Sequence, residues 1–192
     1  MPLKLYLAGP EVFLKDARSV LDAKAQLTRA YGFEPVKPGD IFIEPAPTPR
    51  EFGLRISSVD EHMMNSADGI IANLTPFRGI AADVGTAFEL GYMCAQGKIA
   101  CAYTNVADSH FDRAMRHYEG SVSKDENGRW RGPDGISIED VEMIDNLMLH
   151  GGVVRRSGLV AVHAAAPEAL YSDLTAFEQC LKFIAERHGD RL

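Results

Sequence analysis

The sequence predicts an α/β fold in which one parallel sheet is covered by helices on both faces. Short apolar segments of strand length alternate with longer segments of helical periodicity along the chain of 192 residues. This alternation is typical of βαβ units, whose buried strands are continuous apolar runs. The length favours a single domain over residues 1–192, with one polar insertion at about residues 105–138.

The N-terminal part is expected to contain two strands and one helix. The first strand covers residues 3–8 and ends at Gly9-Pro10. A helix over about residues 13–31 follows, because apolar residues recur there near helical spacing and Gly32 can end it. The second strand covers residues 33–36.

Two loops and two helices occupy the middle of the chain. Residues 37–49 are rich in proline and are expected to form a loop, and a loop of this length is often functional. A helix over residues 57–66 precedes the third strand, residues 70–74. A second loop, residues 75–82, leads into a helix over about residues 86–96 and a fourth strand over residues 99–103.

The C-terminal part is less regular. Residues 105–138 are polar and rich in glycine, which predicts a partly ordered insertion rather than a second domain. A helix is predicted over residues 138–149, the last strand at residues 153–154 or 158–162, and a final helix over residues 174–187. Ligands of parallel sheets bind at the carboxyl ends of the strands, so residues 6–13, 73–89 and the loop before the last helices should line a site.

Net charge, cysteine spacing and the length of apolar runs limit the partners and the cellular location that can be expected. The formal net charge is -7, which argues against nucleic acid or an anionic membrane as the main partner and leaves small molecules open. Cys94, Cys101 and Cys180 have no spacing that suggests a disulfide framework or a zinc site. No run approaches about 18 continuous apolar residues, and residues 3–8 are too short for a signal peptide. We therefore expect a cytoplasmic protein with reduced thiols.

Most familiar catalytic motifs are missing. The six histidines have no metal-binding spacing, so no metal site is predicted. No serine lies in a G-x-S-x-G context, and the chain has no P-loop. These observations disfavour a metalloenzyme, a serine hydrolase and a P-loop nucleotidase.

The segment 83–92 carries the clearest chemistry, because Asp83 and Glu89 lie on either side of a predicted helix start. A carboxylate that attacks the anomeric carbon of a sugar forms a covalent glycosyl intermediate. Placement of Glu89 in the first turn would favour its ionised form through the helix dipole. The alternative is a capping box, in which Thr86 and Glu89 only satisfy the free N–H groups of their own helix. A side chain folded back to cap is not free to attack, so the two roles compete.

Three further positions have both a functional and a structural interpretation. The small-residue turn after the first strand lets a ligand approach the backbone at Gly9, although it lacks the G-x-G-x-x-G fingerprint. Tyr6 lies inside the strand and is equally compatible with a core position. Asp60 lies early in its predicted helix, where the dipole alone favours an acidic residue.

Taken together, these segments resemble the nucleoside 2-deoxyribosyltransferase family. The resemblance rests on four places in order, of which the third is the most specific: Tyr6-Leu7-Ala8-Gly9-Pro10, residues 60–74 around Asp68-Gly69, Arg78-Gly79 through residues 83–92, and Asp145-Asn146-Leu147-Met148. The insertion lies outside it. The resemblance implies a flavodoxin-like sheet and an active site completed across a homo-oligomer interface.

The resemblance also implies a role for each matching residue. Glu89 matches the nucleophile, and Tyr6 matches a tyrosine that orients that carboxylate. Asp60 matches an aspartate that contacts the base and helps its protonation. The remaining expected substrate contacts are the sugar ligand Asp83, Asn146 supplied by a neighbouring subunit with Met148 beside it, and Gly9 and Phe13 of the first loop.

The implied reaction is transfer of a 2-deoxyribosyl group between purine or pyrimidine bases by two displacements, with no metal or organic cofactor. Its partners are deoxynucleosides and free nucleobases. Two alternatives remain open at this point: a 2′-deoxynucleoside 5′-monophosphate N-glycosidase of the same fold, and a non-catalytic nucleotide sensor. Asn146 favours the transferase over the glycosidase, which has a small hydroxyl residue there.

Overall fold

The computed structural model describes residues 1–188. Its centre is a sheet of five parallel strands in the order β2-β1-β3-β4-β7. The strands are β1 (Lys4–Ala8), β2 (Glu34–Val36), β3 (Gly69–Asn73), β4 (Ile99–Thr104) and β7 (Val160–Val162). The strand order reverses direction between β1 and β3, as in flavodoxin-like sheets, so a crevice for ligands is expected at the carboxyl ends of these two strands.

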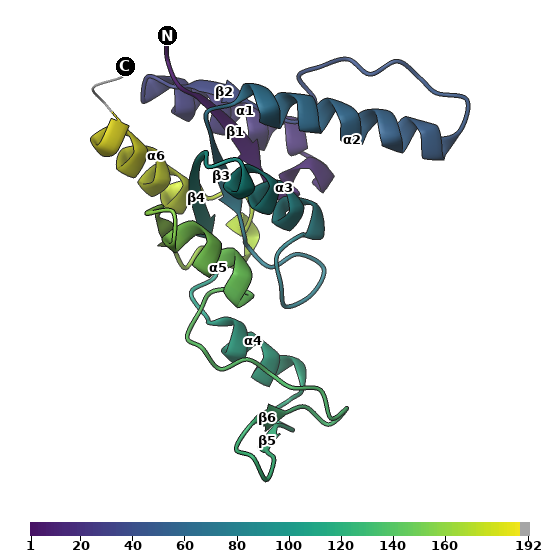
Figure 1. The fold of residues 1–192 in the computed structure, drawn as a ribbon, viewed down its shortest axis with the longest axis vertical. Helices are drawn as coiled ribbons and strands as arrows, with labels where there is room; N and C mark the ends of the chain where they lie inside the picture. Colours follow the sequence, from purple (N-terminus) through teal and green to yellow (C-terminus); the bar gives the residue numbers. More distant parts are fainter. Residues whose placement is uncertain (189–192) are drawn as a thin grey trace.

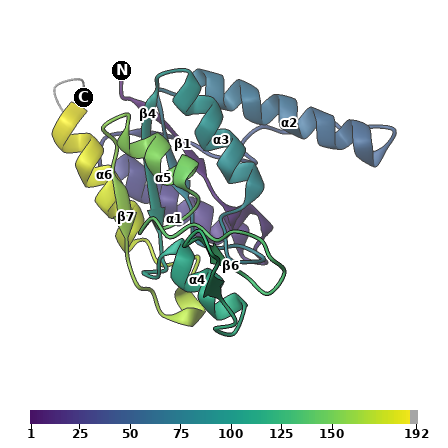
Figure 2. The ribbon, with the colours of Figure 1, turned by 60° about the horizontal axis from the view of Figure 1, so that its bottom comes forward.

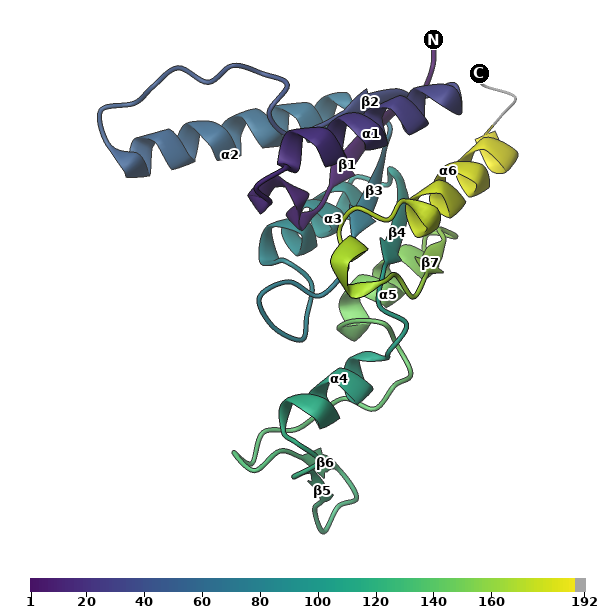
Figure 3. The same ribbon diagram turned by 180° about the vertical axis from the view of Figure 1, so that it is seen from behind.

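Helices cover both faces of the sheet, which confirms the predicted fold class. On one face α2 (Pro49–Ser66), α3 (Val84–Ala95) and α5 (Leu147–Val154) pack against a core that includes Tyr6 and Leu90. On the other face α1 (Ala17–Ala30) and α6 (Thr175–His188) pack against a core centred on Phe177. Figure 1 shows α3 and α5 in front of the sheet, and Figure 3 shows α1 and α6 from behind.

Side-chain alternation along β1 decides which face each residue serves. Leu5 and Leu7 belong to the core under α1 and α6, whereas Tyr6 points to the face that α2 and α3 cover. The hydroxyl of Tyr6 is thereby directed toward the helix that carries Glu89.

Two helices on the N-terminal side begin at other residues than predicted. Residues 10–13 form a short 3-10 turn (Pro10–Phe13), so α1 begins at Ala17 instead of residue 13. The helix α2 begins at Pro49, well before residue 57, because the Thr48 side chain accepts from the Glu51 amide and proline fits the first helical position. Only Met63 and Met64 of α2 are buried, and its N-terminal half projects beyond the sheet (Figure 1). That exposed half has no core-facing pattern that could have predicted it.

The predictions for the C-terminal part are partly wrong. Residues 138–146 contain no helix, and α5 begins only at Leu147, because the Asn146 side chain accepts from the Met148 amide and caps it there. Residues 153–154 belong to this helix, and the last strand is β7, within the alternative range 158–162. The final helix lies within one residue of its predicted bounds at each end.

The polar segment 105–138 contains regular elements. It forms α4 (His110–His117) and a small antiparallel pair, β5 (Ser123–Lys124) and β6 (Trp130–Arg131). The rings of Phe111 and Trp130 pack at 5.3 Å between centroids. In Figure 1 the segment extends away from the sheet at the bottom of the view. Figure 2 is turned so that this segment comes forward. Within residues 1–188, no helix has the length and apolarity needed to span a membrane.

Candidate active site

Glu89 and Tyr6 meet between α3 and the sheet. Glu89 lies in the second turn of α3, and the Tyr6 hydroxyl donates a hydrogen bond of 2.7 Å to Glu89 Oε1. Tyr6 is fully buried, so its ring holds the hydroxyl in one place. Glu89 Oε1 is therefore fixed by Tyr6, and Oε2 remains available to a ligand.

The capping-box interpretation of Glu89 is wrong. The helix α3 begins at Val84 and is capped by Asp83, whose Oδ2 accepts from the Thr86 amide at 2.9 Å and from the Thr86 hydroxyl at 3.2 Å. Thr86 is inside the helix and Glu89 lies a turn beyond the free N–H groups. The acidic residue that serves the helix start is therefore Asp83, and Glu89 is free for another role.

Burial dominates the electrostatics of Glu89. Removal from water raises the pKa of Glu89 to about 7, and the carboxylates of Asp60 and Asp83 also raise it. The hydrogen bond from Tyr6 and the positive charge of Lys24 act in the opposite direction. The expectation that the helix start would favour the ionised form is wrong, because Glu89 lies beyond the first turn and desolvation outweighs the helix dipole.

Asp60 lies in the C-terminal half of α2, because this helix begins earlier than predicted. The dipole at a helix N-terminus therefore does not account for an acidic residue here. Burial raises the pKa of the Asp60 carboxyl, so this group holds a proton more readily than an exposed aspartate. Asp60 and Glu89 are two carboxyl groups with raised pKa values on facing helices.

A cavity of about 400 Å³ opens beside these carboxyl groups, a size typical of small-molecule sites. Its polar lining comes from Asp60, Asp83, Thr86 and Glu89. The rest is mostly apolar and comes from α2, the first loop and the proline-rich loop: Gly9, Val12, Phe13, Pro38, Gly39, Ile41, Ile43, Phe52, Ile56, Val59 and Gly85. The cavity combines an apolar wall with a group of carboxylates.

The fold thus brings most of the predicted site residues together. Asp60, Asp83, Glu89, Gly9 and Phe13 line one cavity, and Tyr6 supports Glu89 from the sheet.

Asn146 and Met148 are the exceptions among the predicted residues. Neither lines this cavity. Asn146 Oδ1 accepts from the Met148 amide at 3.0 Å, and Met148 is 72% exposed. In this chain the two residues lie on the surface at the start of α5.

A second buried network under the first loop was not foreseen. Glu11 and Lys24 are fully buried and form an ion pair of 2.9 Å. Glu11 Oε1 also accepts from the Asn73 amide and the Tyr103 hydroxyl. The only hint in the sequence is Lys24 itself, a charged residue on the apolar side of α1 between Leu21 and Ala25.

This network also explains the glycine of the first loop. A Cβ atom on Gly9 would meet Glu11 Oε2 at 1.9 Å and the Cβ of Asn73 at 2.9 Å. The space beside Gly9 is thus occupied by the protein's own carboxylate. A larger residue at position 9 would displace Glu11 from the ion pair.

Aromatic packing fixes the side of the cavity at Phe13. The Phe13 and Phe77 rings stack at 5.3 Å, and the Arg78 guanidinium lies over both at 5.2 and 4.7 Å. Arg78 has a φ of 53°, a strained value for a residue with a side chain. The loop after β3 is thereby held against the first loop.

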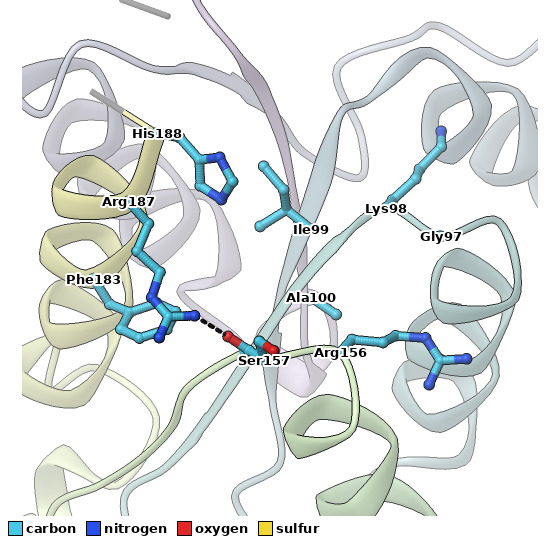
Figure 4. A pocket seen from close by; sticks show the side chains of 10 residues that line it. Gly97, Lys98, Ile99, Ala100, Arg156, Ser157, Phe183, Arg187 and His188 are labelled. Carbon is cyan, nitrogen blue, oxygen red and sulfur yellow. Dashed lines mark hydrogen bonds between the residues drawn. The ribbon is translucent and has the colours of Figure 1, made fainter. Parts of the chain in front are cut away.

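Another hollow, of about 510 Å³, lies at the opposite end of the sheet near the start of β4. It is lined by basic residues, but Figure 4 shows the Lys98 and Arg156 side chains directed away from its centre. Both donate to carbonyl groups at helix ends, and Arg187 donates to the Ser157 carbonyl. These cations satisfy the backbone, and no predicted site residue lies there.

Known proteins resemble the chain in sequence and in fold. A protein of Schizosaccharomyces pombe with no described function is 30% identical over 195 residues, which cover 95% of this chain and 89% of that protein. A solved structure described as a 2-desoxiribosyltransferase from Leishmania mexicana is 27% identical, with a TM-score of 0.68 over 97% of this chain and 99% of that one. A conserved protein from Enterococcus faecalis V583, at 19% identity and a TM-score of 0.54 over 95% and 99% of the two chains, shares the fold.

A family model also matches more than half of the chain. The model described as nucleoside 2-deoxyribosyltransferase matches residues 5–148. This range runs from the first strand to the start of α5 and so includes both the carboxylate cavity and the surface residues Asn146 and Met148. On the strength of this match, the chain belongs to the nucleoside 2-deoxyribosyltransferase family.

Proposed function

We propose that this chain is a nucleoside 2-deoxyribosyltransferase that moves a 2-deoxyribosyl group between purine or pyrimidine bases. The observation that carries the proposal is the carboxyl group of Glu89, held by Tyr6 at the edge of a cavity with an apolar wall. A nucleophile needs an oriented lone pair and a site from which water is excluded when substrate binds. The Tyr6 hydrogen bond orients the carboxylate, and the apolar wall favours the exclusion of water.

In the first displacement, Glu89 Oε2 attacks C1′ of a 2′-deoxynucleoside. The bond between C1′ and the base nitrogen breaks, and the base leaves with the bonding electrons and accepts a proton. Asp60, whose pKa burial raises, faces the same cavity and is the proposed source of that proton. Two carboxyl groups, one as nucleophile and one as acid, are the usual pair in retaining glycosyl transfer.

In the second displacement, a nitrogen of an incoming base attacks C1′ from the side that the first base left. The ester bond to Glu89 breaks, the carboxylate is regenerated, and the proton of the incoming base returns to Asp60. Two inversions retain the β configuration. Water in place of the second base gives hydrolysis, so exclusion of water by the apolar wall favours transfer.

The cavity lining suggests how a nucleoside lies. Apolar side chains of α2 and the proline-rich loop offer a surface for the flat faces of a base. Asp83 uses Oδ2 to cap α3, which leaves Oδ1 to accept from a sugar hydroxyl. Asp83 thus joins the helix start to the substrate.

The site is proposed to be shared between subunits of a homo-oligomer. Asn146 and Met148 lie outside their own subunit's cavity, and the two helices that line the cavity, α2 and α3, carry exposed apolar side chains. Val84 is 85% exposed, Leu54 61% and Phe88 57%. Large exposed apolar side chains on the helices of a site support an interface there. A second copy that packs there would cover them and present its own Asn146 to the sugar.

The reaction is tested by incubation of the protein with deoxyinosine or thymidine, with and without free adenine. We expect deoxyadenosine to form only when adenine is added. Free hypoxanthine or thymine alone would point to hydrolysis, and no change in the nucleoside would favour the sensor.

A matched pair of variants tests the nucleophile. Glu89→Gln is expected to lower the transfer rate by several orders of magnitude, because an amide cannot displace the base. Glu186→Gln, an exposed position on α6, is the control and should behave as the unaltered protein. Near-normal transfer by a folded Glu89→Gln variant would rule out this mechanism.

A further inference from the structure

Arg113 is a buried arginine that the polar segment 105–138 contributes to the body of the protein. It lies on α4 and is 5% exposed. Its guanidinium donates to backbone carbonyls in three separate segments: Ile80 at 2.7 Å, Asp108 at 2.7 Å and Ile144 at 2.5 Å. One side chain thus joins the loop after β3, the residues just before α4 and the loop before α5.

The acidic partner of Arg113 extends this network to two proposed substrate ligands. Arg113 forms an ion pair of 3.2 Å with Asp145, which is 1% exposed. Asp145 Oδ2 also accepts from the Ala82 amide at 2.9 Å, and Oδ1 accepts from the Asn146 amide at 2.7 Å. Ala82 immediately precedes Asp83, so the backbone beside each sugar ligand is bonded to the same carboxylate.

Only arginine can make this set of contacts. Its planar guanidinium carries five donors in a fixed arrangement, whereas the lysine ammonium is a single point with three. Two charges buried away from water are costly unless every donor and acceptor has a partner. Arg113 and Asp145 have no buried side-chain nitrogen or oxygen without a partner, because three carbonyls, two backbone amides and the bond between the two side chains satisfy them. The result is a rigid connection between loops.

We propose that Arg113 is a positioning residue that fixes Asp83 in its own subunit's site and Asn146 for the site of the neighbouring subunit. This inference rests on the proposed function. It gives the polar segment a role, because that segment supplies the residue that sets the geometry of the two sugar ligands. A shift of the segment would move both ligands together.

Arg113→Lys tests the inference, with Arg116→Lys as the matched control. Arg116 is on the same helix but pairs with Asp108 at the surface. The substrates are 2′-deoxyinosine and 2′,3′-dideoxyinosine, with adenine as acceptor. Asp83 can bond the 3′-hydroxyl only of the first. The kcat/KM for 2′-deoxyinosine divided by that for 2′,3′-dideoxyinosine therefore reports the contact with the 3′-hydroxyl. A general loss of folded protein lowers both values and leaves this ratio unchanged.

We expect Arg113→Lys to reduce this ratio roughly tenfold or more, the size associated with one hydrogen bond to a charged group. Arg116→Lys should leave the ratio unchanged. An unchanged ratio in folded Arg113→Lys, whether or not both activities fall, would overturn the inference. Asp145→Asn, which preserves the volume but removes the charge, is expected to lower the ratio as well and serves if Arg113→Lys does not fold. Absence of transfer by the unaltered protein would instead refute the proposed function.

Discussion

At the scale of single residues, opposing effects set the chemistry of Glu89. Its burial disfavours the negative charge that an attacking carboxylate needs, and Asp60 and Asp83 add to this. The Tyr6 hydroxyl and the Lys24 ammonium favour the charge. The balance raises the pKa of Glu89 to about 7. A carboxylate with a pKa in this range is a better nucleophile than an ordinary one, and about half of it is ionised at neutral pH.

The pH dependence of transfer follows from this value. Only ionised Glu89 can attack, so kcat/KM should fall as the pH drops below about 7. Tyr6→Phe removes a hydrogen bond that lowers the pKa of Glu89, so the acidic limb should move to higher pH. The shift should be roughly one to two pKa units, if the bond contributes about 1.5–3 kcal/mol.

Tyr92→Phe is the control for this measurement, because its hydroxyl contacts Asn65 outside the cavity. The proposed role of Tyr6 is refuted if the pH–rate profiles of Tyr6→Phe and of the unaltered protein coincide.

The same raised pKa predicts how stability depends on pH. The folded protein holds the Glu89 proton up to about pH 7, whereas an unfolded chain releases it near the ordinary value of 4.5. Stability from this group is therefore present at low pH and is lost as the pH rises through 7. Position 89 does not titrate in Glu89→Gln. The free energy of unfolding of this variant, relative to the unaltered protein, should therefore rise by up to about 3 kcal/mol between pH 4.5 and pH 7. Chemical denaturation at pH 5 and 8 measures this, and an equal difference at both would contradict it.

The Glu11–Lys24 pair is predicted to stabilise the first loop. Lys24→Met leaves the buried Glu11 carboxylate without its cation and should cost about 3–5 kcal/mol of unfolding free energy. The double variant Glu11→Gln and Lys24→Met removes both charges and should cost less than the single one. Denaturation of both variants provides the comparison. A double variant less stable than Lys24→Met would show that the charges are not the main contribution.

At the scale of elements, the starts of α2, α3 and α5 place the site. Each of these helices is capped by a side chain, from Thr48, Asp83 and Asn146 respectively. Two of these caps, Asp83 and Asn146, are also the proposed sugar ligands. A residue that caps a helix has a fixed backbone and one fixed oxygen, so its remaining polar atoms are already oriented for a substrate.

Substitution of Asp83 separates its two functions. Asp83→Ser keeps a good helix cap but removes the carboxylate, whereas Asp83→Ala removes both. We expect the free energy of unfolding of Asp83→Ser to lie within about 1 kcal/mol of that of the unaltered protein. Asp83→Ala should be less stable than the unaltered protein by about 0.5–2 kcal/mol. Both should lose transfer activity to a similar degree. If Asp83→Ser retained normal kcat/KM, Asp83 would be a helix cap alone.

At the scale of the whole molecule, strand order decides where the site forms. The reversal between β1 and β3 separates the loops that follow these strands, and α3 lies against the opening. Much of the N-terminal half of α2, and the side chains of Val84 and Phe88 on α3, are exposed in the single chain. A closed, symmetric oligomer would cover this surface on every subunit.

Mixed oligomers test whether the site is shared. Glu89→Ala lacks the nucleophile and Asn146→Ala lacks the proposed sugar contact, so each variant alone should be inactive. If the two residues of one site come from different chains, co-assembly should rebuild some complete sites and restore a measurable fraction of activity.

Differential tagging confirms that mixed oligomers have formed. Activity that stays at the sum of the two separate variants, in the presence of such oligomers, would show that Asn146 serves its own subunit or none.

The sequence by itself determined the fold class and predicted most of the residues now proposed for the site. Alternation of apolar segments is a local property, so it predicted a parallel sheet between helices without knowledge of strand order. Short motifs placed Tyr6, Asp60, Asp83 and Glu89 in order, and all four meet at one cavity edge in the structure. The start of α2 was missed because its exposed half has no core-facing pattern.

Only the tertiary structure decided how these residues behave. The bond between Tyr6 and Glu89 joins positions 83 residues apart. The bond of Arg113 to Ile80 joins positions 33 residues apart, and that of Tyr103 to Glu11 joins positions 92 residues apart. The pKa of Glu89 depends on burial, on a hydrogen bond from β1, on charges from α1 and α2, and on the charge of Asp83 in the loop before α3. Desolvation and non-local hydrogen bonds are properties of packed neighbours in space, and a linear pattern of residue types does not contain them.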